Sequence, residues 1–210
     1  MLDVHVPHGK MIGVKDFFLH LLTIVIGLLI ALGLEGWVEY EHHRHVAHQA
    51  EDGLRAEIAN NAHLVGPIRQ QIKDHQKELE ANQKFLAEMR AHRHATGSRI
   101  TLGSGKFDDI SWKTAQNTGA IAYMSYKDAQ TFSNIYLEQD EFLRVGRLST
   151  EDTLNCASLF NSHPDDWVPS PAQNDIITDR MGKAQQDLML LVAIVNELDE
   201  RYQKFESEHK

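Results

Sequence analysis

The sequence contains few of the residues that cross-link small domains or build catalytic sites. Cys156 is the only cysteine, so no disulfide can form within the chain, and we expect it to be a small buried hydrophobic residue. The motifs His-Glu-x-x-His, Cys-x-x-Cys and Gly-x-Ser-x-Gly are absent. No nucleophile and base occur at a fixed spacing. The sequence therefore predicts neither an enzyme nor a bound cofactor.

An excess of positive charge is also missing. The chain has 21 Lys and Arg against 30 Asp and Glu, which gives a net charge of −9. Residues 1–34 contain two lysines and two aspartates, so all of this charge belongs to the rest of the chain. An acidic domain repels phosphate backbones, which argues against nucleic acid as a partner. The 42% apolar content is ordinary and predicts a folded core.

One long run without charged residues extends from Phe17 to Leu34. As a helix its 18 residues span about 27 Å, close to the hydrocarbon thickness of a bilayer. Trp37 and Tyr40 follow at the depth where aromatic side chains act as interfacial anchors. A buried helix of a soluble protein is rarely apolar on every face. The run therefore predicts a single transmembrane helix, with the lipid bilayer as a partner.

The flanks of this run indicate how it sits in the membrane. Residues 31–33 loosely resemble a signal-peptide cleavage site, but the helical pattern continues through residues 35–48, which favours an uncleaved anchor. Two lysines precede the run, and a single arginine follows it closely. The positive-inside rule therefore predicts a cytoplasmic segment at residues 1–16 and a soluble domain outside, in the periplasm of a bacterium.

Gly27 and Ala31 form a small-xxx-small pair inside the run. This spacing lets two membrane helices approach closely, and it predicts a packing surface. We expect a homo-oligomer, or a subunit of a larger membrane complex.

Two amphipathic stripes outside the run, the first over residues 54–89 and the second over residues 177–205, predict an all-α fold. We expect a long membrane-proximal helix over residues 35–95, continuous with the transmembrane helix, and an antiparallel helical bundle completed by residues 96–210. The second stripe packs on the first or, alternatively, on the same helix of a second subunit. The predicted helix–helix core comprises Ile58, Val65, Ile72, Leu79, Leu86, Leu188, Leu191, Val195 and Leu198.

Local signals refine this outline. Gly66-Pro67 predicts a kink or break in the long helix, which we expect to fade after Ala95. Polar residues at core positions of the first stripe either fix the register or face a wet groove; they are Asn61, His75 and Asn82. Further helices are predicted over residues 111–119, from Ser125 to about Gly146, over 151–160, and from Pro171 onward. Residues 188–195 are all apolar and are expected to be buried on most sides.

A histidine-rich segment follows the predicted span. Glu41, His45 and His48 share one face of a helix, and this spacing can hold zinc or copper. Imidazoles here could also respond to pH near 6. The alternative is a solvated helix surface in a chain with 13 histidines.

Two segments resemble uncharacterised bacterial single-pass membrane proteins with a helical extracytoplasmic domain. One is Ile26-Gly-Leu-Leu-Ile-Ala-Leu-Gly-Leu-Glu-Gly-Trp37 with the charged helix after it; the other is Trp112, Gly119 and the helix with Tyr136. The resemblance covers about residues 15–60 and 108–140. It implies a topology and a helical domain, and it implies no activity.

Together these features predict a membrane-anchored, non-enzymatic structural or protein-interaction module that self-assembles. The alternative is an extracytoplasmic sensor or accessory subunit that responds to metal or pH through Glu41, His45 and His48.

Overall fold

The computed structural model describes residues 13–91, 105–162 and 167–208. In these residues there are four α-helices, one 3-10 helix and no strand. The elements in chain order are α1 (Val14–Arg90), α2 (Ile110–Asn117), η1 (Ala120–Tyr123), α3 (Tyr126–Asn161) and α4 (Pro171–Glu208). The predicted all-α fold, with a long N-terminal helix and a helical bundle, is confirmed.

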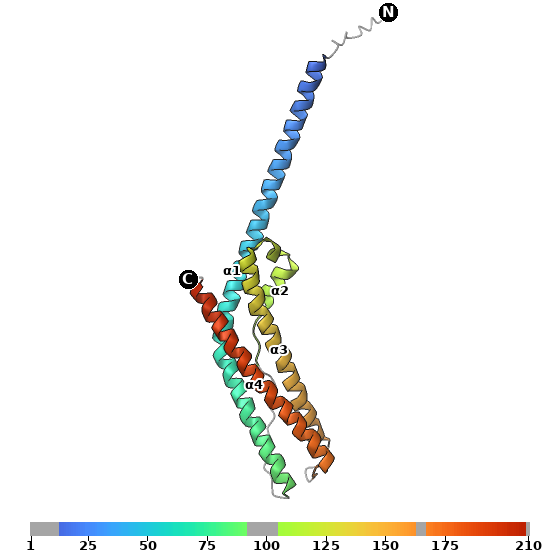
Figure 1. Ribbon diagram of the computed structural model, residues 1–210, viewed down its shortest axis with the longest axis vertical. Helices are drawn as coiled ribbons and strands as arrows, with labels where there is room; N and C mark the ends of the chain where they lie inside the picture. The colour runs from blue at the N-terminus through green and yellow to red at the C-terminus, as the bar shows by residue number, and fades with distance from the viewer. Residues whose placement is uncertain (1–12, 92–104, 163–166, 209–210) are drawn as a thin grey trace, which may run out of the picture.

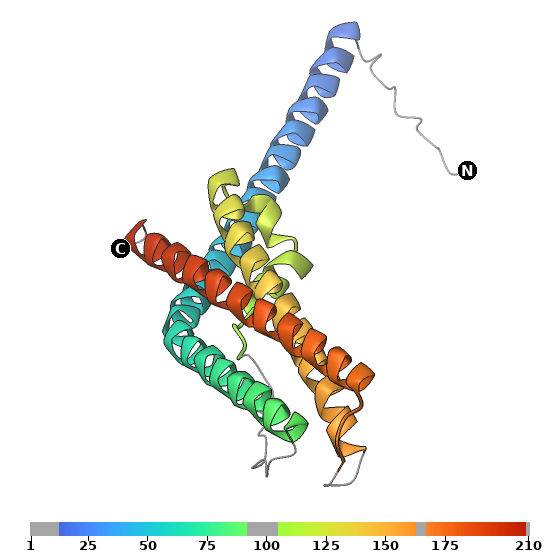
Figure 2. The ribbon, with the colours of Figure 1, turned by 60° about the horizontal axis from the view of Figure 1, so that its bottom comes forward.

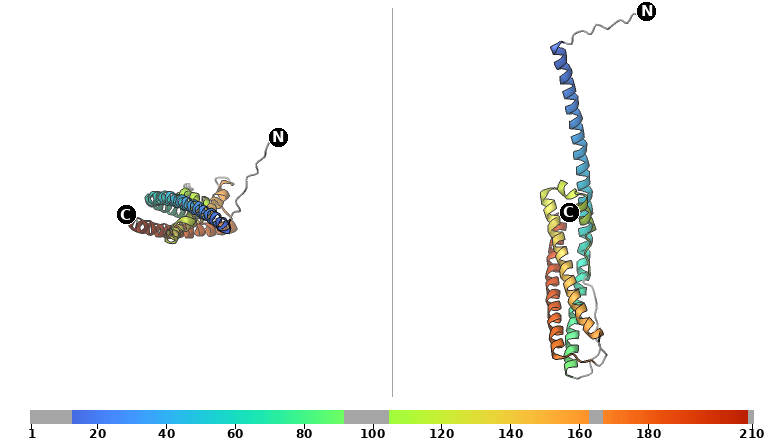
Figure 3. Two further views of the ribbon diagram at one scale, coloured as in Figure 1. Left: turned by 90° about the horizontal axis from the view of Figure 1, so that it is seen from above. Right: turned by 90° about the vertical axis from the view of Figure 1, so that its right-hand side faces the viewer.

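The first part of α1 projects alone from a three-helix bundle (Figures 1 and 3). The bundle consists of the second part of α1, α3 and α4. Helix α4 runs antiparallel to the other two and packs against both of them. The small elements α2 and η1 cover the end of the bundle from which α1 projects. This end therefore lies closest to the apolar run.

Helix α1 is continuous for 77 residues and passes through Pro67 without a break. Pro67 and His63 are both exposed. The carbonyl of His63, which loses its amide donor to the proline, can therefore be solvated. Figure 2 shows that the axis of α1 changes direction in the middle of the helix. The helix ends at Arg90 with Ala91 as its C-cap, earlier than predicted, and residues 92–95 lie outside the described part.

Helix α3 is one element where the sequence predicted two. It continues through Gly146, which is buried. A glycine inside a helix costs about 1 kcal/mol relative to alanine. The neighbouring Phe142 and Val145 are fully buried, and their burial outweighs that cost.

Both long C-terminal helices begin at serine N-caps, Ser125 and Ser170. At α3, the Asp128 amide donates to Ser125 Oγ at 3.1 Å, and this hydroxyl donates to Asp128 Oδ2 at 2.6 Å. At α4, the Gln173 amide donates to Ser170 Oγ at 3.4 Å, and the Ser170 amide donates to Gln173 Oε1 at 2.9 Å. The pair at α4 is a full capping box that satisfies two backbone amides, whereas the pair at α3 satisfies one.

The two stripes form the core of the bundle. All nine residues predicted for the helix–helix core are buried. The expectation that residues 188–195 are buried on most sides is wrong, because Met189 is 58% exposed and Leu190 is 44% exposed. Helix α4 packs on α1 and α3 with one side only, so its opposite side faces water even where the sequence is apolar.

A short extended segment, residues 105–109, runs through the middle of the bundle. Phe107 is fully buried, with its ring 5.2 Å from the ring of Phe142 and 6.0 Å from that of Tyr202. The side-chain amide of Asn61 makes two hydrogen bonds with the backbone of Asp108. Asn61 Nδ2 donates to the Asp108 carbonyl at 2.7 Å, and the Asp108 amide donates to Asn61 Oδ1 at 2.8 Å. Asn61 thus pairs with this segment, whereas His75 and Asn82 are half-buried.

Gly105 begins this segment with φ +79°, a conformation that L side chains rarely adopt. A Cβ at this position would lie 2.7 Å from Ile68 Cγ1 and 2.8 Å from Gln71 Oε1. Glycine is therefore required by both the backbone conformation and the close approach to α1.

We expect Gly105→Ala to lower the free energy of unfolding by about 2 kcal/mol, from left-handed strain plus steric contact. The matched control is Gly182→Ala in α4, where no atom lies within 4 Å of the added Cβ. This control should be neutral or stabilising by up to about 1 kcal/mol. Denaturant unfolding of the full chain in detergent, followed by circular dichroism, measures both changes. Equal effects at the two glycines would contradict the steric argument.

Candidate membrane-proximal interaction site

The apolar run occupies the projecting part of α1. Every residue from Phe17 to Leu34 is exposed, and the helix meets the length and composition requirements of a membrane span, with no part of the apolar window buried in the protein. The first buried residue along α1 is Ala47. His43 and Val46 before it are already half-buried, so the stretch that joins the run to the bundle is residues 35–42, over roughly 12 Å. Trp37 and Tyr40 are exposed on this stretch.

The structure does not gather Glu41, His45 and His48 around a common point. Glu41 Oε1 accepts from Arg44 Nη1 at 3.3 Å, and His48 Nδ1 lies 3.7 Å from a Glu51 carboxylate oxygen. Among the described residues, no group of three or more His, Cys, Asp or Glu is placed to hold a metal ion. The metal and pH responses of this segment stay predictions without support from the geometry.

One histidine of the segment has a contact outside α1. The ring of His43 stacks on the ring of Tyr123 in η1, with 3.9 Å between centroids and 11° between planes. This contact fixes η1 beside α1, three residues past Tyr40. It marks the level of α1 at which the bundle begins.

A carboxylate of α1 holds the two neighbouring elements in place. Glu57 is buried; its Oε1 accepts from the Tyr136 hydroxyl of α3 at 2.6 Å, and its Oε2 accepts from the Ser111 amide of α2 at 2.7 Å. Asp109, the N-cap residue of α2, makes no side-chain capping bond. Glu57 of α1 therefore caps the N-terminus of α2. The dipole of α2 stabilises a negative charge at this end of the helix.

Aromatic side chains pack at the junction of α1, α2 and α3 around Glu57. The ring of Trp112 stacks on the ring of Tyr136, with centroids 5.0 Å apart and planes 4° apart. Burial raises the pKa of the Tyr136 phenol, and its hydrogen bond to Glu57 raises it further. Tyr136 therefore keeps its proton at neutral pH and remains the donor to Glu57. Burial also raises the pKa of Tyr202, whose hydroxyl accepts from Gln139 Nε2 at 2.9 Å.

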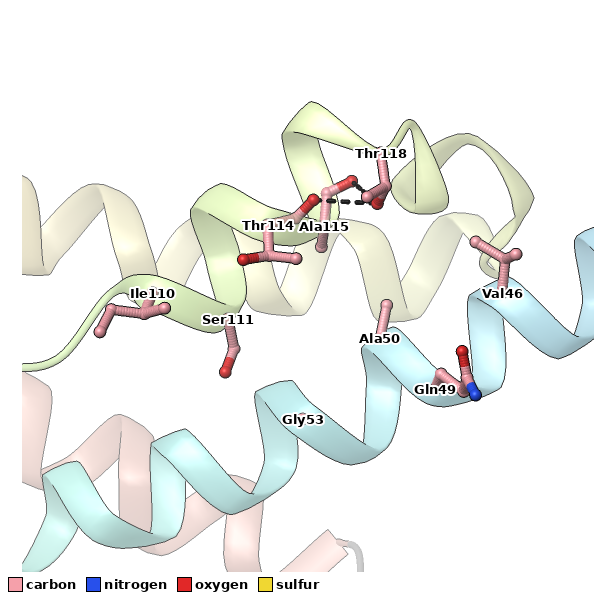
Figure 4. A pocket seen from close by; sticks show the side chains of 9 residues that line it. All are labelled: Val46, Gln49, Ala50, Gly53, Ile110, Ser111, Thr114, Ala115 and Thr118. Atoms are coloured by element: carbon pink, nitrogen blue, oxygen red, sulfur yellow. Dashed lines mark hydrogen bonds between the residues drawn. The ribbon is translucent and has the colours of Figure 1, made fainter.

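A groove lies between α1 and α2 next to this junction (Figure 4). Its volume is about 410 Å³, and it has small apolar side chains with a few amide and hydroxyl groups. The lining residues are Val46, Gln49, Ala50, Gly53, Ile110, Ser111, Thr114, Ala115 and Thr118. No acidic, basic or thiol side chain lines it, so the groove lacks groups for acid–base catalysis.

Comparison of the chain with known protein families, curated proteins and solved structures found no match. The resemblance to bacterial single-pass membrane proteins therefore stays a prediction. Sequence reasoning missed Glu57 and Phe107 as core residues. The signal available for Glu57 was its place one residue before Ile58 in the first stripe, beside the core face.

We expect Tyr136→Phe to lower the free energy of unfolding by about 2 kcal/mol, because it leaves a buried carboxylate oxygen of Glu57 without its donor. Tyr202→Phe removes a hydroxyl that accepts only a neutral hydrogen bond from Gln139, and should cost about 1 kcal/mol. Both substitutions keep the buried ring. Denaturant unfolding of the full chain in detergent tests the order, and a larger loss for Tyr202→Phe would contradict it.

Proposed function

We propose that this protein is a single-pass membrane protein whose helical bundle is a non-enzymatic interaction module held close to the bilayer. The observation that carries the proposal is the run Phe17–Leu34: it is apolar on every side, unburied in the protein, and part of the same continuous helix as the bundle. Exposure of such an apolar surface to water has a high free-energy cost, and burial in the hydrocarbon core of a bilayer removes that cost.

The polarity of the two ends supports a direction for the anchor. Lysines precede the run and the acidic bundle follows it. The proposal therefore includes an N-terminus in the cytoplasm and a bundle outside the inner membrane of a bacterium. The lining of the groove between α1 and α2 supports a role in binding rather than in catalysis, since hydroxyl and amide groups are its only polar groups.

The geometry of α1 also supports self-assembly through the span. At 3.6 residues per turn, Gly27 and Ala31 lie roughly 180° around the helix from Leu54 and Ile58, which pack in the bundle. Two copies that meet at Gly27 would therefore carry their bundles on opposite outer sides, so the bundles leave the membrane contact unobstructed.

Membrane insertion is tested by placing two cations in the span. We expect Leu22→Arg with Leu29→Arg to move most of the protein from the carbonate-resistant membrane fraction to the soluble or degraded fraction. Arginine near the centre of a membrane helix costs about 3 kcal/mol per residue on insertion scales. The matched control is Ile110→Arg with Leu137→Arg, two exposed apolar residues of the bundle. Loss of membrane association in both variants, or in neither, would contradict the proposed anchor.

Self-assembly is tested at the small residues of the span. We expect Gly27→Leu to shift the full chain in nanodiscs or mild detergent from oligomer to monomer by at least tenfold in population, because the larger side chain separates the helices. Gly33→Leu is the control, since Gly33 lies roughly 120° around α1 from Gly27 and roughly 160° from Ala31, and also has no atom within 4 Å of an added Cβ. Native mass spectrometry gives the populations. An unmodified chain that is monomeric and carries no partner would contradict the interaction module.

A further inference from the structure

Two exposed tyrosines lie at the end of the bundle that faces the span. Tyr126 is 82% exposed at the first position of α3, and Tyr123 is 47% exposed at the end of η1. With Ala122 and Lys127, which are also exposed, they form what we call the η1–α3 corner. Figures 1 and 3 show this corner at the end of the bundle from which α1 projects.

The stacking of Tyr123 on His43 sets the height of this corner relative to the span. A hydrocarbon core of roughly 30 Å takes about 20 helical residues, so a core that begins at Phe17 ends near Gly36. His43 lies seven residues further, which is roughly 10 Å along the axis of α1. The headgroup layer fills about 5–8 Å of that distance. An upright α1 would therefore hold the corner just outside the headgroups.

A normal tilt of α1 brings the corner into the headgroup layer. Membrane helices tilt by about 20° on average. The corner is displaced sideways from α1 by about the distance between packed helices, roughly 10 Å. A 20° tilt toward the corner therefore lowers it by about 3 Å, to roughly 7 Å from the hydrocarbon boundary. At that depth a tyrosine ring reaches the polar side of the interface.

The chemistry of the corner fits this layer. Tyrosine combines an apolar ring with a polar hydroxyl, which is why it is enriched at membrane interfaces. Lys127 adds an exposed ammonium group that can reach a lipid phosphate. The carboxylate of Asp128 accepts a hydrogen bond from Ser125 at the start of α3.

We propose that the η1–α3 corner is a second lipid contact, in which Tyr123 and Tyr126 insert into the headgroup layer of the leaflet that α1 leaves. The inference rests on the proposed membrane anchor. Its consequence is a defined orientation: one contact through α1 leaves the bundle able to lean in any direction, whereas two contacts fix the direction in which it leans.

The test measures depth with a fluorescent label on single cysteines in a Cys156→Ser background, using the full chain in phosphatidylcholine nanodiscs. Headgroup-level spin-labelled lipid is the quencher for positions 122 and 151. Lipid spin-labelled near the end of its acyl chain is the quencher for position 25, which lies near the middle of the hydrocarbon core. Ala122→Cys reports the corner, Glu151→Cys reports an exposed site far along α3, and Val25→Cys reports the span. We expect quenching at position 122 to be at least twice that at position 151. Tyr126→Ser keeps the stack of Tyr123 on His43 and should by itself lower the quenching at position 122; adding Tyr123→Ser should bring it down to the level of position 151. Leu137→Ser with Leu148→Ser, two exposed leucines of α3, should leave it unchanged.

The outcomes separate this inference from the anchor. An unquenched label at position 25 would overturn the anchor itself. A quenched label at position 25 together with weak quenching at position 122 would overturn the second contact alone, and would leave the corner as a surface for a protein partner. Quenching at position 122 that is indifferent to the two tyrosine substitutions would also overturn it. Circular dichroism of each variant shows whether the bundle remains folded.

Discussion

The arrangement of the end of the bundle from which α1 projects depends on one buried carboxylate. Glu57 of α1 binds the first turn of α2 and the hydroxyl of Tyr136 in α3, so a single side chain connects three helices. A charge in this position is stable only while both partners remain, since an unpaired buried carboxylate costs several kcal/mol. The other contacts follow from it: Trp112 can stack on Tyr136 only when α2 lies at this place, and α2 in turn leads into η1 beside His43.

The continuity of α1 determines how the apolar run and the bundle are connected. No loop separates the apolar run from the bundle, so the two share one helix axis up to the contact of His43 with η1. A rotation or tilt of the apolar run is therefore passed to the bundle through backbone hydrogen bonds rather than through a flexible linker. Residues 35–42 are the part of this axis between the run and the stack of His43 on Tyr123, and we expect bending of the molecule to be concentrated there.

The sequence indicated the helix starts well and some helix interiors poorly. The N-caps Ser125 and Ser170 are local signals, because each serine bonds a group three residues away, and the sequence predicted a helix start at each of them. Gly146 was expected to end a helix because glycine is a weak helix former, but burial of its neighbours keeps the helix intact. For residues 188–195, composition predicted burial, and the placement of α4 against only two helices left Met189 and Leu190 in water.

The sequence by itself determined the apolar run, the all-α fold and the two stripes of core residues. Each of these features lies within a single helix: the run is recognised by its length without charge, and the stripes by the 3.6-residue period of the helix. The tertiary structure decided where the polar groups of different helices meet. Glu57 and Tyr136 are 79 residues apart, and Asn61 and Asp108 are 47 apart. Such pairs depend on how helices are offset along one another, which no local periodicity specifies. The same is true of the η1–α3 corner, whose distance from the span is fixed by the contact between Tyr123 and His43.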